Sequence, residues 1–147
     1  MRVLMFLMAA LVPLVALAQG KPLPKGLEEL GIALPVSLGM TAADLDKTKG
    51  NVVKSGRFVA MTFGDTYQLS IKMTPDEKRV QQIVIPVGKD EYRRIVNTAR
   101  TLYSEGNHYE SEKLDDYESH VWKDKNTLMA LIRNKGGQRL ELSERDE

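Results

Sequence analysis

The chain has two histidines, His108 and His120, and the segment between them is rich in carboxylates. Imidazole and carboxylate groups bind zinc and harder divalent metals, so this segment is a candidate metal site. The candidate ligands are His108, His120, Asp115 and Asp116. Their spacing follows neither H-E-x-x-H nor another regular ligand pattern, and an acidic loop that leads into a strand has the same composition. Metal binding is therefore one alternative hypothesis.

A first candidate binding patch lies on a predicted strand over residues 117–123 and comprises His120, Trp122 and Lys123. Because successive side chains of a strand alternate between faces, His120 and Trp122 share one face, opposite Val121. Two explanations fit this aromatic pair: both rings pack on the sheet, or one of them contacts a ligand.

Two arginines form a second candidate patch. Arg93, Asn97 and Arg100 lie along one face of a predicted helix over residues 89–103. Guanidinium and amide groups in a row can receive a carboxylate or a phosphate, although solvated helices carry similar rows. The sequence contains no G-x-S-x-G nucleophile motif, and its one glycine pair lies in a predicted hairpin turn. A binding protein without a cofactor is therefore favoured over an enzyme.

The segments that would position these residues switch between helical and strand periodicity. Tyr67, Leu69 and Ile71 illustrate the alternation of apolar and polar residues that predicts a strand. The predicted order is helix 42–48, strands 57–63, 67–73 and 80–87, helix 89–103, a polar loop at 107–116, and strands 117–123, 127–133 and 138–143. This order is approximately α-β-β-β repeated twice. We predict an α+β fold in which helices pack on one face of one or two antiparallel sheets.

The amino terminus has the three parts of a secretory signal peptide. Arg2 supplies a positive start, an apolar run follows, and Ala16 and Ala18 place small residues at a cleavage point. The apolar run is shorter than the roughly 20 residues that a membrane-spanning helix needs. We predict a signal peptide at residues 1–18, cleaved after Ala18, and a mature protein that is periplasmic or secreted and carries no membrane anchor.

The mature chain is expected to consist of a leader and one domain. Residues 19–35 begin with prolines and lysines and predict a flexible leader that contains a short helical segment. Residues 36–147 are predicted to form a single α+β domain, with possible halves at 36–88 and 89–147.

Composition excludes several classes of protein. The chain has 147 residues, of which 28% are charged and 42% apolar, so it is neither disordered nor fibrous. The absence of cysteine removes thiol catalysis, cysteine-based zinc sites and disulfides. The net charge is +1, and loss of Arg2 with the signal leaves a neutral mature chain. A nucleic-acid partner is therefore not expected.

The stretch VSLGMTAADL, at residues 36–45, resembles the Gly-Met-Thr opening of small envelope proteins of the SmpA/OmlA type. Those proteins have an α-α-β-β-β module, and a similar module occurs twice in the β-lactamase inhibitor protein. The resemblance implies a periplasmic module that binds other proteins. This chain departs from the SmpA/OmlA pattern because it has no lipid-bearing cysteine and has Gly50-Asn51 where the family has Gly-Pro.

These observations lead to one expected function and two alternatives. We expect an exported, non-catalytic protein that presents a sheet face or an edge strand to another envelope or secreted protein. The first alternative is a small exported enzyme or metal-binding protein that uses the segment between His108 and His120. The second is an inhibitor of a secreted hydrolase, which the resemblance to the β-lactamase inhibitor protein suggests.

Overall fold

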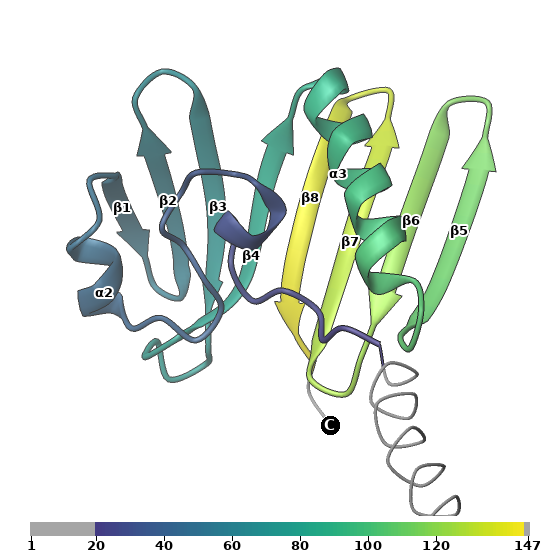
Figure 1. The fold of residues 1–147 in the computed structure, drawn as a ribbon. Coiled ribbons are helices and arrows are strands. Elements are labelled where there is room, and N and C mark those ends of the chain that lie inside the picture. Colours follow the sequence, from purple (N-terminus) through teal and green to yellow (C-terminus); the bar gives the residue numbers. More distant parts are fainter. Residues whose placement is uncertain (1–19, 146–147) are drawn as a thin grey trace, which may run out of the picture.

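Eight antiparallel strands form one open sheet in the computed structural model, which describes residues 20–145 (Figure 1). The strand order is β1-β2-β3-β4-β8-β7-β6-β5, so two four-stranded meanders meet where β4 pairs with β8. The strands are β1 (Asn51–Ser55), β2 (Phe58–Phe63), β3 (Tyr67–Met73), β4 (Val80–Val87), β5 (His108–Leu114), β6 (Tyr117–Lys123), β7 (Thr127–Asn134) and β8 (Gly137–Glu144). The helical elements are the 3-10 turn η1 (Glu28–Leu30), α2 (Ala42–Asp46) and α3 (Lys89–Tyr103). The α+β class with an antiparallel sheet is confirmed.

Helix α3 covers one face of the carboxyl-terminal half of the sheet, and Figure 1 shows it in front of those strands. Its buried side chains are Tyr92, Ile95, Val96, Ala99 and Tyr103. They recur at intervals of three or four residues, so they form one apolar stripe along the helix. The stripe faces the sheet, and the charged residues of α3 lie at its flanks and on its outer side.

The core lies on the same face of the sheet. Leu69, Ile83, Leu140 and Trp122, from four different strands, are each at most 1% exposed. Cross-strand partners such as Ile83 and Leu142 share this face because paired residues of antiparallel strands lie side by side. Alternation along each strand then determines which side chains face α3 and which face the opposite side.

The segment before α2 is packed against the domain, which corrects the expected flexible leader at residues 19–35. Its apolar side chains are buried in the core: Leu23, Leu27, Leu30, Ile32 and Leu34. The Leu27 N–H donates to Val36 O at 3.2 Å, and Arg94 Nη1 on α3 donates to Leu30 O at 3.1 Å. The expected short helical segment is present as η1. Residues from this segment extend the apolar layer beside α3, because α3 alone leaves part of the core face uncovered.

Two strands occur where the sequence predicts none. Strand β5 occupies most of the expected polar loop at residues 107–116, and β1 follows α2. Apart from Tyr109 and Leu114, the side chains of β5 are polar, and almost all are exposed, so the alternation that predicts a strand is missing. Each half of the sheet therefore has four strands instead of the expected three.

Helix α2 begins as its sequence predicts. Thr41 Oγ1 accepts a hydrogen bond from the Asp44 N–H at 3.1 Å, and Asp44 Oδ2 accepts one from the Thr41 N–H at 3.1 Å. This reciprocal pair satisfies two backbone donors at the helix start. The helix ends at Asp46, two residues before the predicted end.

The amino-terminal prediction concerns residues outside the described part of the chain. The signal peptide at residues 1–18, with cleavage after Ala18, stays a prediction. Within residues 20–145, no helix has both the length and the apolar character required to cross a lipid bilayer.

Candidate functional site

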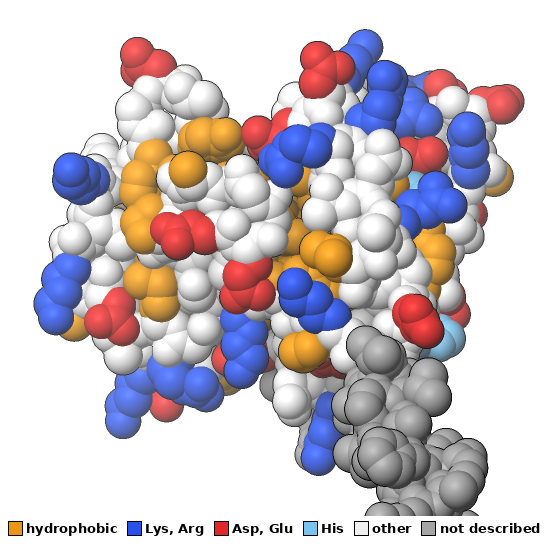
Figure 2. Space-filling model, viewed as in Figure 1, with side chains coloured by type: hydrophobic (Ala, Val, Ile, Leu, Met, Phe, Trp, Pro, Cys, Tyr) orange, Lys and Arg blue, Asp and Glu red, His pale blue; other side chains and the backbone are white. Residues whose placement is uncertain are grey.

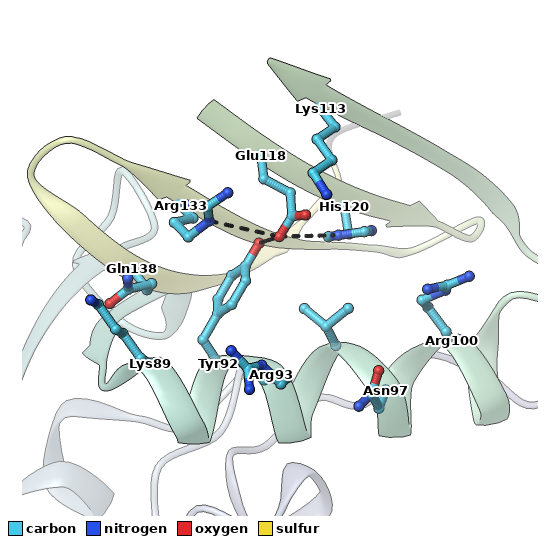
Figure 3. A pocket seen from close by; sticks show the side chains of 11 residues that line it. Lys89, Tyr92, Arg93, Asn97, Arg100, Lys113, Glu118, His120, Arg133 and Gln138 are labelled. Atoms are coloured by element: carbon cyan, nitrogen blue, oxygen red, sulfur yellow. Dashed lines mark hydrogen bonds and ion pairs between the residues drawn. The ribbon is translucent and has the colours of Figure 1, made fainter. Parts of the chain in front are cut away.

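A cleft lies between α3 and the strands of the carboxyl-terminal half of the sheet (Figure 3). Its volume is about 540 Å³, and small-ligand sites measure roughly 300–1,000 Å³. One wall is formed by α3 and carries Lys89, Tyr92, Arg93, Val96, Asn97 and Arg100. The other wall is formed by β5 to β8 and carries Lys113, Glu118, His120, Arg133 and Gln138.

Positive charge dominates the cleft. The five cations that line it are Lys89, Arg93, Arg100, Lys113 and Arg133, and the only carboxylate in the lining is Glu118. Among residues 20–145, Arg133 is the only one of the five that forms an ion pair with a carboxylate. Figure 2 shows Lys and Arg side chains gathered over α3 and the strands beside it. Clustered cations without counter-charges create a local potential that attracts anions.

Glu118 is already engaged by its neighbours. Its Oε2 accepts a hydrogen bond from Tyr92 Oη at 3.0 Å, and it lies 3.7 Å from His120 Nε2 and 3.9 Å from Arg133 Nε. Figure 3 shows these three interactions converging on one carboxylate. Glu118 therefore links the two walls of the cleft, and the other four cations have no partner carboxylate within residues 20–145.

Burial beside Glu118 determines the protonation states of Tyr92 and His120. Burial raises the pKa of Tyr92, and the neighbouring Glu118 raises it further, so the phenol stays protonated and donates. Burial lowers the pKa of His120; Glu118 opposes this shift and Arg100 adds to it. His120 is therefore neutral at neutral pH, with its Nδ1 at 2.8 Å from Tyr109 Oη.

The structure brings three of the five predicted binding residues together. Arg93 and Arg100 on α3 and His120 on β6 all line the cleft. The second predicted patch therefore joins the first at His120, because α3 crosses the sheet over β6 and its neighbours. The helix presents its arginines to the face of β6 that carries His120.

The other two predicted binding residues lie elsewhere. Trp122 is fully buried, its ring stacks on Tyr109 with centroids 4.9 Å apart, and its Nε1 donates to Ser104 Oγ at 3.0 Å. Of the two explanations for the aromatic pair, packing on the sheet therefore applies to Trp122. Lys123 faces the opposite side of the sheet, since it is the next residue along β6.

The four metal candidates do not converge. His120 lies on the face of the sheet toward α3, whereas His108 pairs with Lys123 on the opposite face and contacts Glu110 at 2.8 Å. Asp115 and Asp116 lie in the turn between β5 and β6. Within residues 20–145, no group of three or more His, Asp or Glu side chains is arranged to hold a metal ion. The geometry therefore gives no support to the metal hypothesis.

Four charged residues of the cleft were not predicted as site residues: Lys89, Lys113, Glu118 and Arg133. Lys113 lies on β5, which the sequence predicts as a loop. Arg133 lies opposite Glu118 in the β6–β7 register, so correct pairing of the two predicted strands would have placed these two together. The strand register is therefore the signal that could have found Glu118 and Arg133.

Comparisons of the chain with protein-family models, with curated proteins and with solved structures found no match. The resemblance to SmpA/OmlA modules and to the β-lactamase inhibitor protein therefore stays a prediction.

Proposed function

We propose that this protein is an exported, non-catalytic binding protein whose cleft receives an acidic segment of another envelope or secreted protein. The observation that carries the proposal is the set of four cleft cations, Lys89, Arg93, Arg100 and Lys113, that have no carboxylate partner among residues 20–145. Guanidinium groups bind carboxylates through charge-assisted and often bidentate hydrogen bonds.

The attraction is local and does not come from the net charge of the molecule. The whole chain carries a formal charge of only +1, yet the cleft holds five cations and one carboxylate. A local field of this kind steers an acidic segment to one place on the surface, without general adhesion to polyanions.

The length of the cleft suits a short peptide. Lys89 and Arg100 lie eleven positions apart on α3, which corresponds to about 16 Å along a helix axis. An extended chain rises about 3.3 Å per residue, so a segment of about five residues spans the same distance. Carboxylates spaced along such a segment can reach cations on both walls.

A labelled hexaglutamate peptide tests the cleft directly. We expect fluorescence anisotropy to show binding that weakens as salt rises, because salt screens charge pairs near the surface. The double variant Arg93→Glu with Arg100→Glu is expected to weaken binding by about tenfold or more, since each reversal replaces attraction by repulsion. The matched control is Lys78→Glu with Lys125→Glu, which makes the same charge change at two exposed turns.

The control variant separates a site from a general charge effect. Binding that is lost in the cleft variant and kept in the control supports the proposal. Equal losses in both variants, or no binding of hexaglutamate by the native protein at low salt, would show that the cleft is not an acidic-peptide site.

Export is tested separately. Expressed in a Gram-negative host, the protein is expected in the periplasmic fraction with Gln19 as its first residue, because signal peptidase requires small residues before the cut. The variant Ala18→Glu is expected to accumulate as the longer precursor. Intact-mass measurement of both fractions distinguishes the two forms, and a native chain that keeps Met1 in the cytosol would contradict export.

A further inference from the structure

Strand β5 is one of the two outer strands of the sheet, and it borders the cleft. It pairs only with β6, so the backbone groups along its outer side have no strand partner among residues 20–145. It is seven residues long and almost wholly exposed. An edge strand of this length can accept an additional strand from another chain.

The two faces of β5 carry opposite charges. On the face toward α3 lie Tyr109, Ser111 and Lys113, as their pairing with Trp122, His120 and Glu118 shows. The opposite face carries His108, Glu110, Glu112 and Leu114. A strand that adds to β5 therefore meets a cation on the α3 side and two carboxylates on the other side.

Helix α3 adds to the positive side. Arg100 lines the main cleft and also a second hollow with Asn97 and Tyr109, which lies between α3 and β5. A ninth strand would lie about 4.8 Å beyond β5. Its side chains on the α3 side would then lie next to Lys113 and over the hollow that Arg100 lines.

We infer that the acidic partner segment leaves the cleft beside Lys113 and Arg100 and continues as a ninth strand on β5, with carboxylates on the α3 side and Lys or Arg on the opposite side. This inference rests on the proposed function and specifies how the segment is held. Backbone hydrogen bonds supply affinity, and the alternation of charge selects the sequence.

A second copy of this chain does not fit the same edge. A two-fold axis pairs five or more residues of β5 with their copies only where it passes through Glu110, Ser111 or Glu112, and each of these registers places one glutamate opposite another on the outer face. Like charges directly opposite are destabilising. The other edge strand, β1, contains no acidic residue that could face Lys113. The occupant is therefore a different protein with an alternating acidic and basic strand.

Two peptides of the same composition test the inference. One alternates, Glu-Lys-Glu-Lys-Glu-Lys-Glu, and the other is blocked, Glu-Glu-Glu-Glu-Lys-Lys-Lys. Only the alternating peptide can separate its two charges onto the two faces of a strand. We expect it to bind at least fivefold more tightly than the blocked peptide. We also expect it to slow hydrogen exchange of β5 amides, because new backbone bonds protect them.

Two further changes address the backbone and the outer face. N-methylation of alternate peptide groups, tested in both registers, removes strand hydrogen bonds along one edge and is expected to abolish the advantage of the alternating peptide. The variant Glu112→Lys places a cation on the outer face and is expected to weaken the alternating peptide at least threefold. The matched control is Glu77→Lys, which reverses an exposed charge in the β3–β4 turn.

The outcomes separate this inference from the proposed function. If the blocked peptide binds as tightly as the alternating one, and Arg93→Glu with Arg100→Glu weakens both, the cleft function stands and the ninth strand is wrong. Unchanged exchange of the β5 amides at saturating peptide also overturns it. If neither peptide nor hexaglutamate binds, both the function and the inference fail.

Discussion

Tyr92 on α3 donates a hydrogen bond to Glu118 on β6, with 3.0 Å between the phenolic oxygen and Oε2. This contact crosses the cleft, and both partners are largely buried: Tyr92 is 5% exposed, and the Glu118 side chain is 20% exposed. It therefore joins the helix to the sheet across the cleft.

The first prediction concerns that bond. Tyr92→Phe removes the donor and leaves Glu118 partly unsatisfied, so the free energy of unfolding should fall by about 1.5–3 kcal/mol, the range for bonds to charged groups. Urea denaturation measures this change. Tyr67→Phe is the control, because Tyr67 donates to Glu91 at 3.2 Å in a more exposed position. This variant should lower the free energy of unfolding by less than Tyr92→Phe does. Equal effects of the two variants would contradict the role of Glu118 at the cleft.

The second prediction concerns Trp122. Its side chain is fully buried against Tyr109, so Trp122→Ala should lower the free energy of unfolding by about 3–5 kcal/mol, the cost of a large core cavity. The neighbouring Lys123→Ala should change stability by less than about 0.5 kcal/mol. Thermal or urea unfolding compares the two. A stable Trp122→Ala protein that loses peptide binding would instead assign Trp122 to the site.

The third prediction concerns pH. Burial lowers the pKa of His120 below its ordinary value, so between the two values the unfolded chain binds more protons than the folded chain. The pKa of His120 in the unfolded chain is about 6.5, and above this pH the stability contributed by neutral His120 is fully present. That stability declines as the pH falls toward the lower pKa of His120 in the folded chain. Unfolding measured from pH 7.5 to pH 5 should show this decline, and His120→Gln should reduce it. A slope that His120→Gln leaves unchanged would assign the decline to other groups.

The fourth prediction concerns the segment before α2. Leu27 is fully buried, so Leu27→Ala should cost about 2–5 kcal/mol, as for other buried leucines. Lys25→Ala, two residues earlier and exposed, should leave stability nearly unchanged. Chemical denaturation of the mature chain provides the comparison. If both variants match the native protein, residues 20–40 do not contribute to the core in solution.

The secondary structure was predicted best where one apolar face is buried against the core. Strands β3, β4 and β6 and helix α3 have the predicted bounds, because alternate or helically spaced apolar residues mark them directly. Strand β5 was missed since both of its faces carry mostly polar side chains, and an edge strand needs no buried face to pair with its neighbour. The packed segment at residues 20–40 was missed because its buried leucines follow no regular period.

The sequence by itself determined the fold class, most elements, the two arginines of α3 and the alternation that pairs His120 with Trp122 on one face. Only the tertiary structure decided that Arg93, Arg100 and His120 share a cleft, that Trp122 is core, and that His108 and His120 lie on opposite faces of the sheet. The physical reason is that periodicity depends on neighbours along the chain. A cleft and a strand register depend instead on contacts between residues that are far apart along the chain, and packing of the folded chain determines those contacts.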